Sequence, residues 1–358
     1  MLANWIKPRS TELVGVDIGT QEIKAVLLSQ SPHGYQLEAI ARIPLEKGVV
    51  VDREIKNSSA VAEAMKQVRA QLPRKARFGA ASVSGSTVMT KVIFMDANLS
   101  DEELEAQIEI EADNLIPYPL EDVNIDFEPL EVNEATSKVS VLLAACRSDN
   151  VESRVEALEA AGLGSKVVDV EGYALGRSFK LLAPQLPCGG ATEVVAMVDM
   201  GASMTTFAII AEGETAFIRE QAFGGEQYTQ TIQSYYGMTG EEAERAKIAG
   251  ELPHNFAIEV LEPFQAQFVQ QIRRTIQIFC NASKHKHIDR LILCGGAVQI
   301  EGLCERLSTE LEIPVQRADP FGGALHASEM LRQSVAGDIG RYMVACGLAL
   351  RSFESWHI

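Results

Sequence analysis

The chain has 358 residues, of which 46% are hydrophobic and 23% are charged, a balance typical of a globular protein with two or more compact units. Its 49 acidic and 32 basic residues give a net charge of −17, which argues against nonspecific binding to nucleic acid or to an anionic membrane surface. The six cysteines are scattered without any closely spaced pair, so the sequence lacks the spacing of zinc sites and of CxxC redox motifs.

The first predicted unit combines buried strands with one helix. Ser58 or Ser59 is expected to cap this helix, and Pro73 ends it. We assign residues 1–84 to a first lobe, which residues 167–190 and 338–358 rejoin later in the chain. Apolar runs predict its strands over residues 13–17, 23–28, 37–43 and 78–83.

Residues 85–166 are predicted to form a smaller subdomain inserted after the first lobe. Ser100 and Glu103 make a capping box that opens a helix, and prolines stop that helix near residue 117. Further patterns predict strands over 88–94 and 139–145 and a helix over 151–161 that Gly162 terminates. These elements are enough for a small core.

A second large unit is predicted over residues 191–337. Three helical stretches lie within it, and the longest carries apolar residues at helical spacing with a kink at Pro263. We expect residues 225–287 to form a subdivision of this lobe. Its strands are predicted over residues 194–198, 205–210, 215–219 and 291–294.

One turn pattern occurs twice, once in each large unit, at Val14–Thr20 and Ala196–Ser203. Each copy is a buried strand, an aspartate, an apolar residue, a glycine and a small residue before a second strand. Glycine allows the backbone amides to close around a phosphate, and Asp17 and Asp199 can orient Mg²⁺ through its water shell. Lys24 can reach the same phosphates. A plain β-hairpin would leave the same pattern once, but two copies favour a phosphate site.

A glycine pair follows the strand predicted over 291–294. Gly295, Gly296 and Ala297 separate this strand from a helix, and glycines there let a base or ribose approach the backbone, although simple turn geometry explains such a pair equally well. The sequence contains neither the GxGxxG of dinucleotide-binding folds nor the GxxxxGK[ST] of P-loops. Two common alternative phosphate folds therefore lose support.

These segments together resemble the superfamily of actin, Hsp70 and sugar kinases. The two phosphate loops correspond to residues 14–24 and 195–206, and the adenosine motif corresponds to residues 291–302. The two connecting segments correspond to residues 170–175 and 344–349. The stretch that holds ribose and adenine corresponds to residues 223–229 and 241–247. The resemblance implies an α/β, actin-like ATPase fold with two lobes, each around a mixed five-stranded sheet, and it implies ATP and Mg²⁺ as ligands. It assigns to the nucleotide Asp17, Gly19, Thr20, Lys24, Asp199, Gly201, Ala202, Ser203, Gly224, Gly225, Glu244, Lys247, Gly295, Gly296 and Ala297.

Within that superfamily the chain resembles, over nearly its whole length, the PilM family of cytoplasmic actin-like proteins in type IV pilus assembly. The specific marks are Glu109–Pro119, Asp126, Phe127 and the glutamate-rich segment 239–247. The resemblance implies that residues 85–166 are the 1C-type subdomain also found in FtsA. It further implies binding of the cytoplasmic N-terminal tail of PilN in a groove between this subdomain and the first lobe, and other platform and motor proteins as possible partners.

We expect a cytoplasmic protein that reaches the inner membrane only through its partners. The first ten residues are too short and polar for a signal peptide, and no window approaches the ~20 apolar residues needed to cross a bilayer. The sequence also ends without the amphipathic membrane helix that is typical of FtsA. This departure favours a PilM-like adaptor over an FtsA-like cell-division protein.

Two other functions stay open at this point. A small-molecule kinase of the same superfamily would need a catalytic carboxylate, for which Asp169 and Glu171 are the candidates, but the segment around them carries no recognisable sugar-binding signature. A nucleotide-free scaffold fits poorly with intact phosphate loops. We expect ATP binding with slow or negligible hydrolysis, because no carboxylate can be assigned firmly to activating water.

Overall fold

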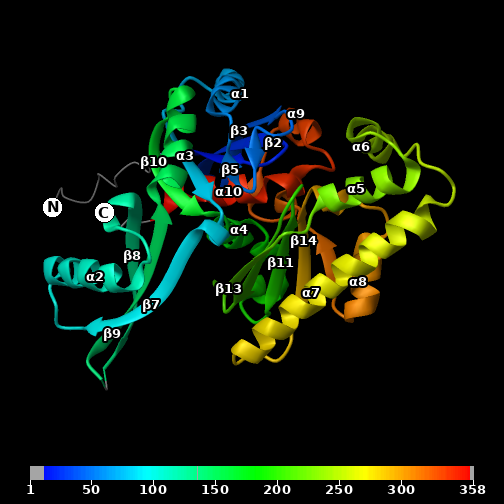
Figure 1. The fold of residues 1–358 in the computed structure, drawn as a ribbon. Helices are drawn as coiled ribbons and strands as arrows, with labels where there is room; N and C mark the ends of the chain where they lie inside the picture. Colours follow the sequence, from blue (N-terminus) through cyan, green and yellow to red (C-terminus); the bar gives the residue numbers. More distant parts are fainter. Residues whose placement is uncertain (1–11, 135, 355–358) are drawn as a thin grey trace.

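The computed structural model describes residues 12–134 and 136–354, which form two large lobes and one small subdomain (Figure 1). Each lobe is built around one mixed sheet, and the subdomain has a three-stranded sheet of its own. The sequence predicted this division. None of the helices within the described ranges is long and apolar enough to cross a membrane.

The first sheet has six strands in the order β10-β6-β1-β2-β3-β16. Strands β1, β2 and β3 are antiparallel, whereas β6, β10 and β16 join the sheet in parallel. The bounds are Leu13–Ile18 for β1, Glu22–Ser31 for β2, Gly34–Pro44 for β3, Phe78–Val83 for β6, Gly164–Val170 for β10 and Leu325–His326 for β16. A short hairpin, β4 (Val50–Val51) and β5 (Glu54–Ile55), lies apart from this sheet.

Strand β16 is one strand more than we expected in the first sheet, and it comes from the range 191–337 assigned to the second lobe. It pairs with Tyr35 and Gln36 of β3. Leu325 is fully buried and packs in one cluster with Leu37 and Val26. The chain therefore returns to the first lobe near residue 325, because burying this leucine against β3 removes its side chain from water.

The first lobe is covered by two helices, α1 (Ser58–Gln71) and α3 (Ser148–Ala160). The side chain of Asn57, rather than Ser58 or Ser59, caps α1 by accepting the amide of Ala60 at 3.0 Å. Helix α3 was expected in the inserted subdomain. Instead Leu158 is fully buried in the first lobe's core with α1, and β10 pairs with β6. The range 85–166 is therefore too long, since residues 148–166 belong to the first lobe.

The inserted subdomain consists of a sheet in the order β7-β9-β8 and one helix, α2. The bounds are Val88–Asp96 for β7, Asp101–Leu115 for α2, Val123–Asn133 for β8 and Lys138–Arg147 for β9. The predicted capping box at Ser100 and Glu103 is confirmed. Residues Ile108 and Ala112 of α2 are buried against Val141 and Leu143 of β9, so one face of the sheet carries the subdomain's core.

The second lobe has a five-stranded sheet in the order β13-β12-β11-β14-β15, as expected. The strands are β11 (Val195–Met200), β12 (Thr205–Ala211), β13 (Glu214–Gln221), β14 (Arg290–Gly295) and β15 (Val315–Arg317). The helices are α5 (Gly225–Tyr236), α6 (Gly240–Ala249), α7 (Glu262–Ala282) and α8 (Leu303–Leu311). Helix α9 (Glu329–Ser334) follows β16 and packs against the first lobe through Leu331. A π-helical turn, Ala257–Leu261, comes directly before α7, whose second residue is Pro263. The kink at Pro263 stays a prediction.

Two helices, α4 (Glu171–Arg177) and α10 (Met343–Leu350), lie between the two large sheets (Figure 1). Every residue of α10 is buried. It crosses β1 at Gly15, where an added Cβ would lie 2.0 Å from the carbonyl of Ala345, and crosses α4 at Gly347. Glycine permits this close packing, which fixes the position of each lobe's β-hairpin relative to the other. Residues 338–358 were assigned to the first lobe, and the last four of them, 355–358, lie outside the described residues.

Candidate functional site

The two repeated turns have the same backbone geometry. The amide of Gly19 donates to the carbonyl of Glu22 at 3.0 Å, and that of Gly201 donates to the carbonyl of Met204 at 2.9 Å. An added Cβ would lie 3.1 Å and 3.3 Å from these carbonyls. Neither glycine has a positive φ. The close approach of the backbone, and not a left-handed conformation, therefore favours glycine in both turns.

The two turns meet between the lobes. The hydroxyls of Thr20 and Ser203 lie 3.1 Å apart although 183 positions separate them in the sequence. Asp17 and Asp199 are the last residue but one of β1 and of β11, directly before these turns. The structure thus brings together the predicted residues of both phosphate loops, and we call this place the interlobe site.

Lys24 lies beside Asp17 because the two are cross-strand partners in β1 and β2. Its Nζ is 2.6 Å from Asp17 Oδ2 and 3.2 Å from the carbonyl of Arg341. Burial opposes a charged lysine, but the carboxylates of Asp17, Asp199 and Glu22 hold the pKa of Lys24 above its usual value. Without a ligand, this lysine therefore neutralises the carboxylate of the first turn.

The side chain of Asp199 makes no hydrogen bond or ion pair among the described residues, unlike that of Asp17. Burial raises the pKa of Asp199 to about 7; Lys24 opposes the shift, and the Glu171 and Asp17 carboxylates add to it. The interlobe site therefore holds more carboxylate charge than its cations offset. A bound divalent cation would relieve this excess.

Glu171 and Asp169, the two predicted catalytic candidates, lie in different surroundings. Glu171 is buried at the start of α4, where it accepts the Thr206 hydroxyl at 3.0 Å and Arg53 Nη1 at 2.5 Å. Burial raises its pKa, while Arg53 acts in the opposite direction. Asp169 instead forms an ion pair of 2.8 Å with Arg177. Of the two, only Glu171 lies at the interlobe site, so Asp169 is not brought to the place where we predicted a base.

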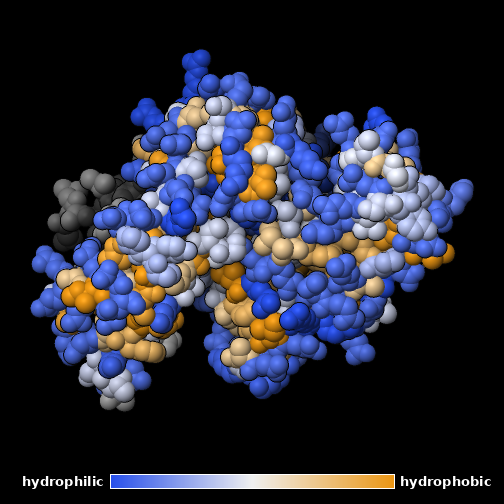
Figure 2. Space-filling model, in the orientation of Figure 1, coloured by the Kyte–Doolittle hydropathy of each residue, from blue (hydrophilic) through white to orange (hydrophobic). Residues whose placement is uncertain are grey.

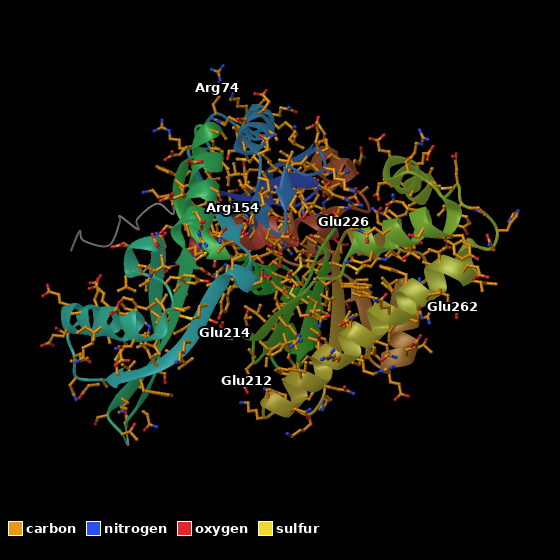
Figure 3. The ribbon with its side chains drawn as sticks, viewed as in Figure 1. Arg74, Arg154, Glu212, Glu214, Glu226 and Glu262 are labelled. Atoms are coloured by element: carbon orange, nitrogen blue, oxygen red, sulfur yellow. The ribbon has the colours of Figure 1, made fainter. Side chains whose placement is uncertain are left out.

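The predicted glycines at the start of α5 approach the second turn. The amide of Gly225 donates to the carbonyl of Gly201 at 3.0 Å, and a Cβ on Gly224 would lie 2.4 Å from the carbonyl of Ala202. Glu226, labelled in Figure 3, follows at the first turn of α5 near the junction of the lobes. The positive end of this helix therefore faces the interlobe site, which favours an anion there.

Glu244 and Lys247, the predicted ribose and adenine contacts, belong to α6 and face Thr229 of α5. Lys247 Nζ is 2.6 Å from Glu244 Oε2 and 2.8 Å from Thr229 Oγ1, and the Thr229 hydroxyl donates to the same carboxylate at 2.6 Å. The ion pair of Glu244 and Lys247 is therefore not a solvent-exposed pair within one helix, because it links α6 to α5. Contact with a nucleotide stays a prediction.

The predicted glycine pair at the end of β14 packs against the second turn. Gly295 has a φ of +79°, and a Cβ there would lie 2.5 Å from both Asp199 Oδ1 and the Met200 carbonyl. Gly296 begins a short helix, Gly296–Gln299, that includes Ala297, and its added Cβ would lie 3.8 Å from Arg341 Nη1. Glycine at 295 therefore lets the end of β14 approach the second turn closely. Arg341 lies beside this end of β14, next to Gly296.

Replacing Gly295 with alanine should destabilise the ligand-free protein by about 2–4 kcal/mol, since the methyl group meets both the left-handed backbone and a steric clash. Gly302→Ala is the matched control, because Gly302 has a φ of +68° and, apart from its chain neighbours, no heavy atom of a described residue lies within 4 Å of an added Cβ. This control should lose about 1 kcal/mol. Chemical denaturation compares the two. Equal losses would show that the contact with Asp199 and Met200 contributes nothing.

The sequence predicted no role at the site for Arg53 or Glu220, and it placed Thr206 only within the segment 195–206 of the second phosphate loop. Glu220 of β13 accepts the hydroxyl of Ser84 and the amides of Gly85 and Ser86, at 2.7 Å and 3.1 Å for the amides. It thereby ties the second lobe to the segment that leads into β7. No spacing marks these residues in the sequence, because each reaches the site from a separate element.

The residues present fit a magnesium–nucleotide complex. The two glycine turns face each other, a cross-lobe hydroxyl pair marks where phosphates would lie, and Asp17 and Asp199 face the same place. Within the described residues there is no cluster of three or more His, Cys, Asp or Glu side chains that could hold a metal ion directly. Coordination through water, which Mg²⁺ retains readily, is compatible with this arrangement.

Comparison with known proteins gives a family match over almost the whole chain. The model of the family described as type IV pilus assembly protein PilM matches residues 15–353. Cell division protein FtsA of Bacillus subtilis (strain 168) is 24% identical over 256 residues, which are 65% of this chain and 57% of FtsA. The aligned region thus spans little more than half the length of this relative.

Two solved structures confirm the actin-like fold. The PilM-PilN type IV pilus biogenesis complex has a TM-score of 0.79 at 24% identity and covers 97% of this chain and 100% of the compared chain. Ethanolamine utilization protein EutJ from Carboxydothermus hydrogenoformans has a TM-score of 0.57 at 16% identity, with 94% and 89% covered. At these identities, the similarity establishes the arrangement of lobes and subdomain.

Proposed function

Because the chain belongs to the PilM family of type IV pilus assembly proteins, we propose that it is an ATP-binding, actin-like adaptor of the inner-membrane assembly platform. In this proposal the cytoplasmic N-terminal tail of PilN docks at the inserted subdomain, and the protein reaches the membrane through such partners. The observation that carries the nucleotide assignment is the meeting of the two turns through Thr20 and Ser203 at 3.1 Å.

In the proposed complex the phosphates lie between the turns of the two lobes. Other amides of the two turns bind phosphate oxygens, the positive end of α5 adds a field that favours their negative charge, and Lys24 exchanges Asp17 for a phosphate. Bound Mg²⁺ would neutralise part of the phosphate charge, with Asp17 and Asp199 orienting its water shell. The base would lie toward the glycines at 295 and 296, near Arg341.

Hydrolysis should be slow or negligible. Glu171 is the one candidate base at the site, and its Oε1 accepts the Thr206 hydroxyl with or without ATP. Burial raises the pKa of the carboxylate, but this hydrogen bond lowers it and makes Glu171 a weaker base for activating water. A phosphate-release assay with Mg-ATP measures the rate. Turnover approaching the ~10 s⁻¹ typical of enzymes would contradict this prediction and favour the kinase alternative.

The PilN tail has a suitable surface on the face of the inserted sheet opposite α2, which we call the outward face. Val92 and Phe94 of β7 are 45% and 65% exposed there. Their cross-strand partners in β9 are Leu142 and Ser140, respectively. Large exposed apolar side chains that lie together commonly mark an interaction site. Figure 2 shows apolar residues on both sides of the notch between this subdomain and the second lobe.

The outward face also approaches the first lobe. Glu128 of β8, on this face opposite Leu142, is close enough to Tyr173 of α4 that burial, Glu128 and Asp169 together raise the pKa of the tyrosine. A peptide on the outward face would therefore contact both subdomain and lobe. Its apolar side chains would cover Val92 and Phe94, and a basic group would pair with Glu128.

Nucleotide and partner binding would be coupled through the lobe arrangement. A ligand shifts such an equilibrium only by its differential affinity for the two arrangements. Glu220 connects β13 of the second lobe to Ser84, Gly85 and Ser86, just before β7. A movement of the lobes would thus be transmitted to the start of the docking subdomain.

Calorimetric titration of the full chain tests the two halves of the proposal separately. Mg-ATP and a synthetic peptide of the PilN tail should each bind, and ATP without Mg²⁺ should bind far more weakly. Absence of Mg-ATP binding would overturn the nucleotide assignment. Absence of peptide binding, both with and without Mg-ATP, would overturn the adaptor assignment.

A further inference from the structure

Arg53 reaches the interlobe site from outside every motif that the sequence resemblance covers. It belongs to the two-residue turn of the hairpin β4–β5, where Asp52 has a φ of 51° and Arg53 a φ of 67°. The left-handed conformation costs a residue with a side chain roughly 1–2 kcal/mol. Two such residues in succession mark a backbone that is held in a particular shape, and strain of this kind is often found at functional positions.

A buried arginine of the first lobe holds this turn. Arg154, labelled in Figure 3, is 3% exposed; its Nη2 donates to the carbonyl of Arg53 at 2.6 Å and its Nε to that of Ser82 at 3.3 Å. The turn is therefore anchored to β6 through α3. This anchoring directs the guanidinium of Arg53 toward the start of α4, where Glu171 accepts it.

The guanidinium of Arg53 has unused hydrogen-bonding capacity. Nη1 binds Glu171, but Nε is buried without a hydrogen-bond partner in the described part of the chain, and an unsatisfied buried donor costs about 1–3 kcal/mol. Burial opposes its charge, while the carboxylates of Glu171, Glu220, Asp17 and Asp199 raise its pKa. Arg53 is thus a permanent cation within electrostatic range of the aspartates of both turns.

Its place relative to the other motifs indicates which part of a nucleotide it would meet. The glycine pair lies on the Arg341 side of the second turn, whereas Arg53 and Glu171 lie at the side of α4 and Thr206. Thr206 is the cross-strand partner of Asp199. The side of the site with Arg53, Glu171 and Thr206 therefore lies directly beside the second Asp-x-Gly turn. A nucleotide with its base at the glycines and its phosphates along the turns ends near Arg53.

We propose that Arg53 binds the terminal phosphate of ATP and that Glu171 competes with this phosphate for the guanidinium. The inference deepens the proposed nucleotide function and rests on it. Without ATP, Glu171 holds Arg53 at 2.5 Å. With ATP, the guanidinium binds phosphate oxygens in the paired geometry that arginine favours, and Glu171 keeps only Thr206. ADP has no group at that position, so the exchange makes the site selective for ATP.

Calorimetry with Mg-ATP and Mg-ADP on the full chain tests this assignment. Arg53→Gln should weaken ATP binding by about 10- to 100-fold, the effect of losing a charge-assisted contact, and change ADP binding by less than about threefold. Glu171→Gln should tighten ATP binding because it removes the competitor. In the double variant this gain should disappear, since the gain acts through Arg53.

Arg290→Gln is the matched control. Arg290 also forms a partly buried ion pair, with Glu193 at 2.9 Å, but it does so at the start of β14, away from Gly295. This variant should leave both affinities unchanged. Arg53→Lys keeps the charge and the same backbone requirement, so it should fold like Arg53→Gln and retain part of the ATP preference.

The outcomes separate this inference from the proposed function. If the wild-type protein binds neither nucleotide, the proposed function fails. If it binds both and Arg53→Gln lowers the two affinities equally or leaves both unchanged, the proposed function stands and the assignment of Arg53 to the terminal phosphate is wrong. If Arg53→Gln does not fold, the other two variants decide. A wild-type ratio of ATP to ADP affinity in both Arg53→Lys and Glu171→Gln would then contradict the assignment.

Discussion

Replacing Asp17 or Asp199 with alanine should weaken the binding of Mg-ATP by about 100-fold or more, the equivalent of about 3 kcal/mol. Each aspartate ends a buried strand before one of the two turns, and both face the same site. Loss of either would remove part of the charge that orients the magnesium water shell. Calorimetry on the purified variants measures the effect, and unchanged affinity in both would contradict the site assignment.

Stability measurements distinguish this loss from unfolding. The pKa of Asp199 is about 7 in the folded protein against about 3.9 in an unfolded chain. Because the folded value is raised, ionisation of this carboxyl destabilises the fold: its stabilising contribution is complete below about pH 4 and is lost as the pH rises toward and through 7. Asp199→Asn should therefore stabilise the ligand-free protein by about 1–3 kcal/mol at pH 8, and by less at pH 5, while still impairing Mg-ATP binding.

Serine at both Val92 and Phe94 should weaken binding of the PilN tail peptide by about 30-fold or more, because anchoring apolar side chains dominate the free energy of such contacts. Both side chains are largely exposed on the outward face, so their replacement leaves the subdomain's core intact. Fluorescence anisotropy with a labelled peptide measures the affinity. Wild-type affinity in the double variant would exclude the outward face as the docking site.

Ile258→Ser provides the control for this prediction. Ile258 is 69% exposed, close to the 65% of Phe94, but it lies in the π-helical turn before α7 at the far end of the second lobe (Figure 1). Its replacement should not change peptide affinity. Point variants are preferable to deleting residues 85–166, because that deletion removes α3, whose Leu158 belongs to the first lobe's core.

Sequence patterns predicted the parts of this fold that depend on neighbouring residues. The strands on both sides of each Asp-x-Gly turn and the capping box at Ser100 were predicted correctly, since each results from local hydrogen bonding or steric restriction. The repeat of the turn also indicated the interlobe site. The meeting of Thr20 with Ser203 follows from two similar hairpins facing each other across α4 and α10.

Long-range packing decided the features that the sequence did not reveal. Strand β16 has only two residues, too few for a periodic pattern, and joins β3 because of the burial of Leu325. Helix α3 has an amphipathic pattern that fits either the subdomain or the first lobe. Arg53 lies in a tight turn whose left-handed backbone is unusual for arginine, so its approach to Glu171 depends on the tertiary anchor that Arg154 supplies.

A crystal structure of the full chain with Mg²⁺ and a non-hydrolysable ATP analogue tests the central claim most directly. The account predicts phosphates between the turns at Gly19 and Gly201, Mg²⁺ held through water near Asp17 and Asp199, and the base beside Gly295 and Gly296. Arg53 should have exchanged Glu171 for the terminal phosphate. A nucleotide bound elsewhere, or an interlobe site unchanged at saturating Mg²⁺ and analogue, would contradict the account.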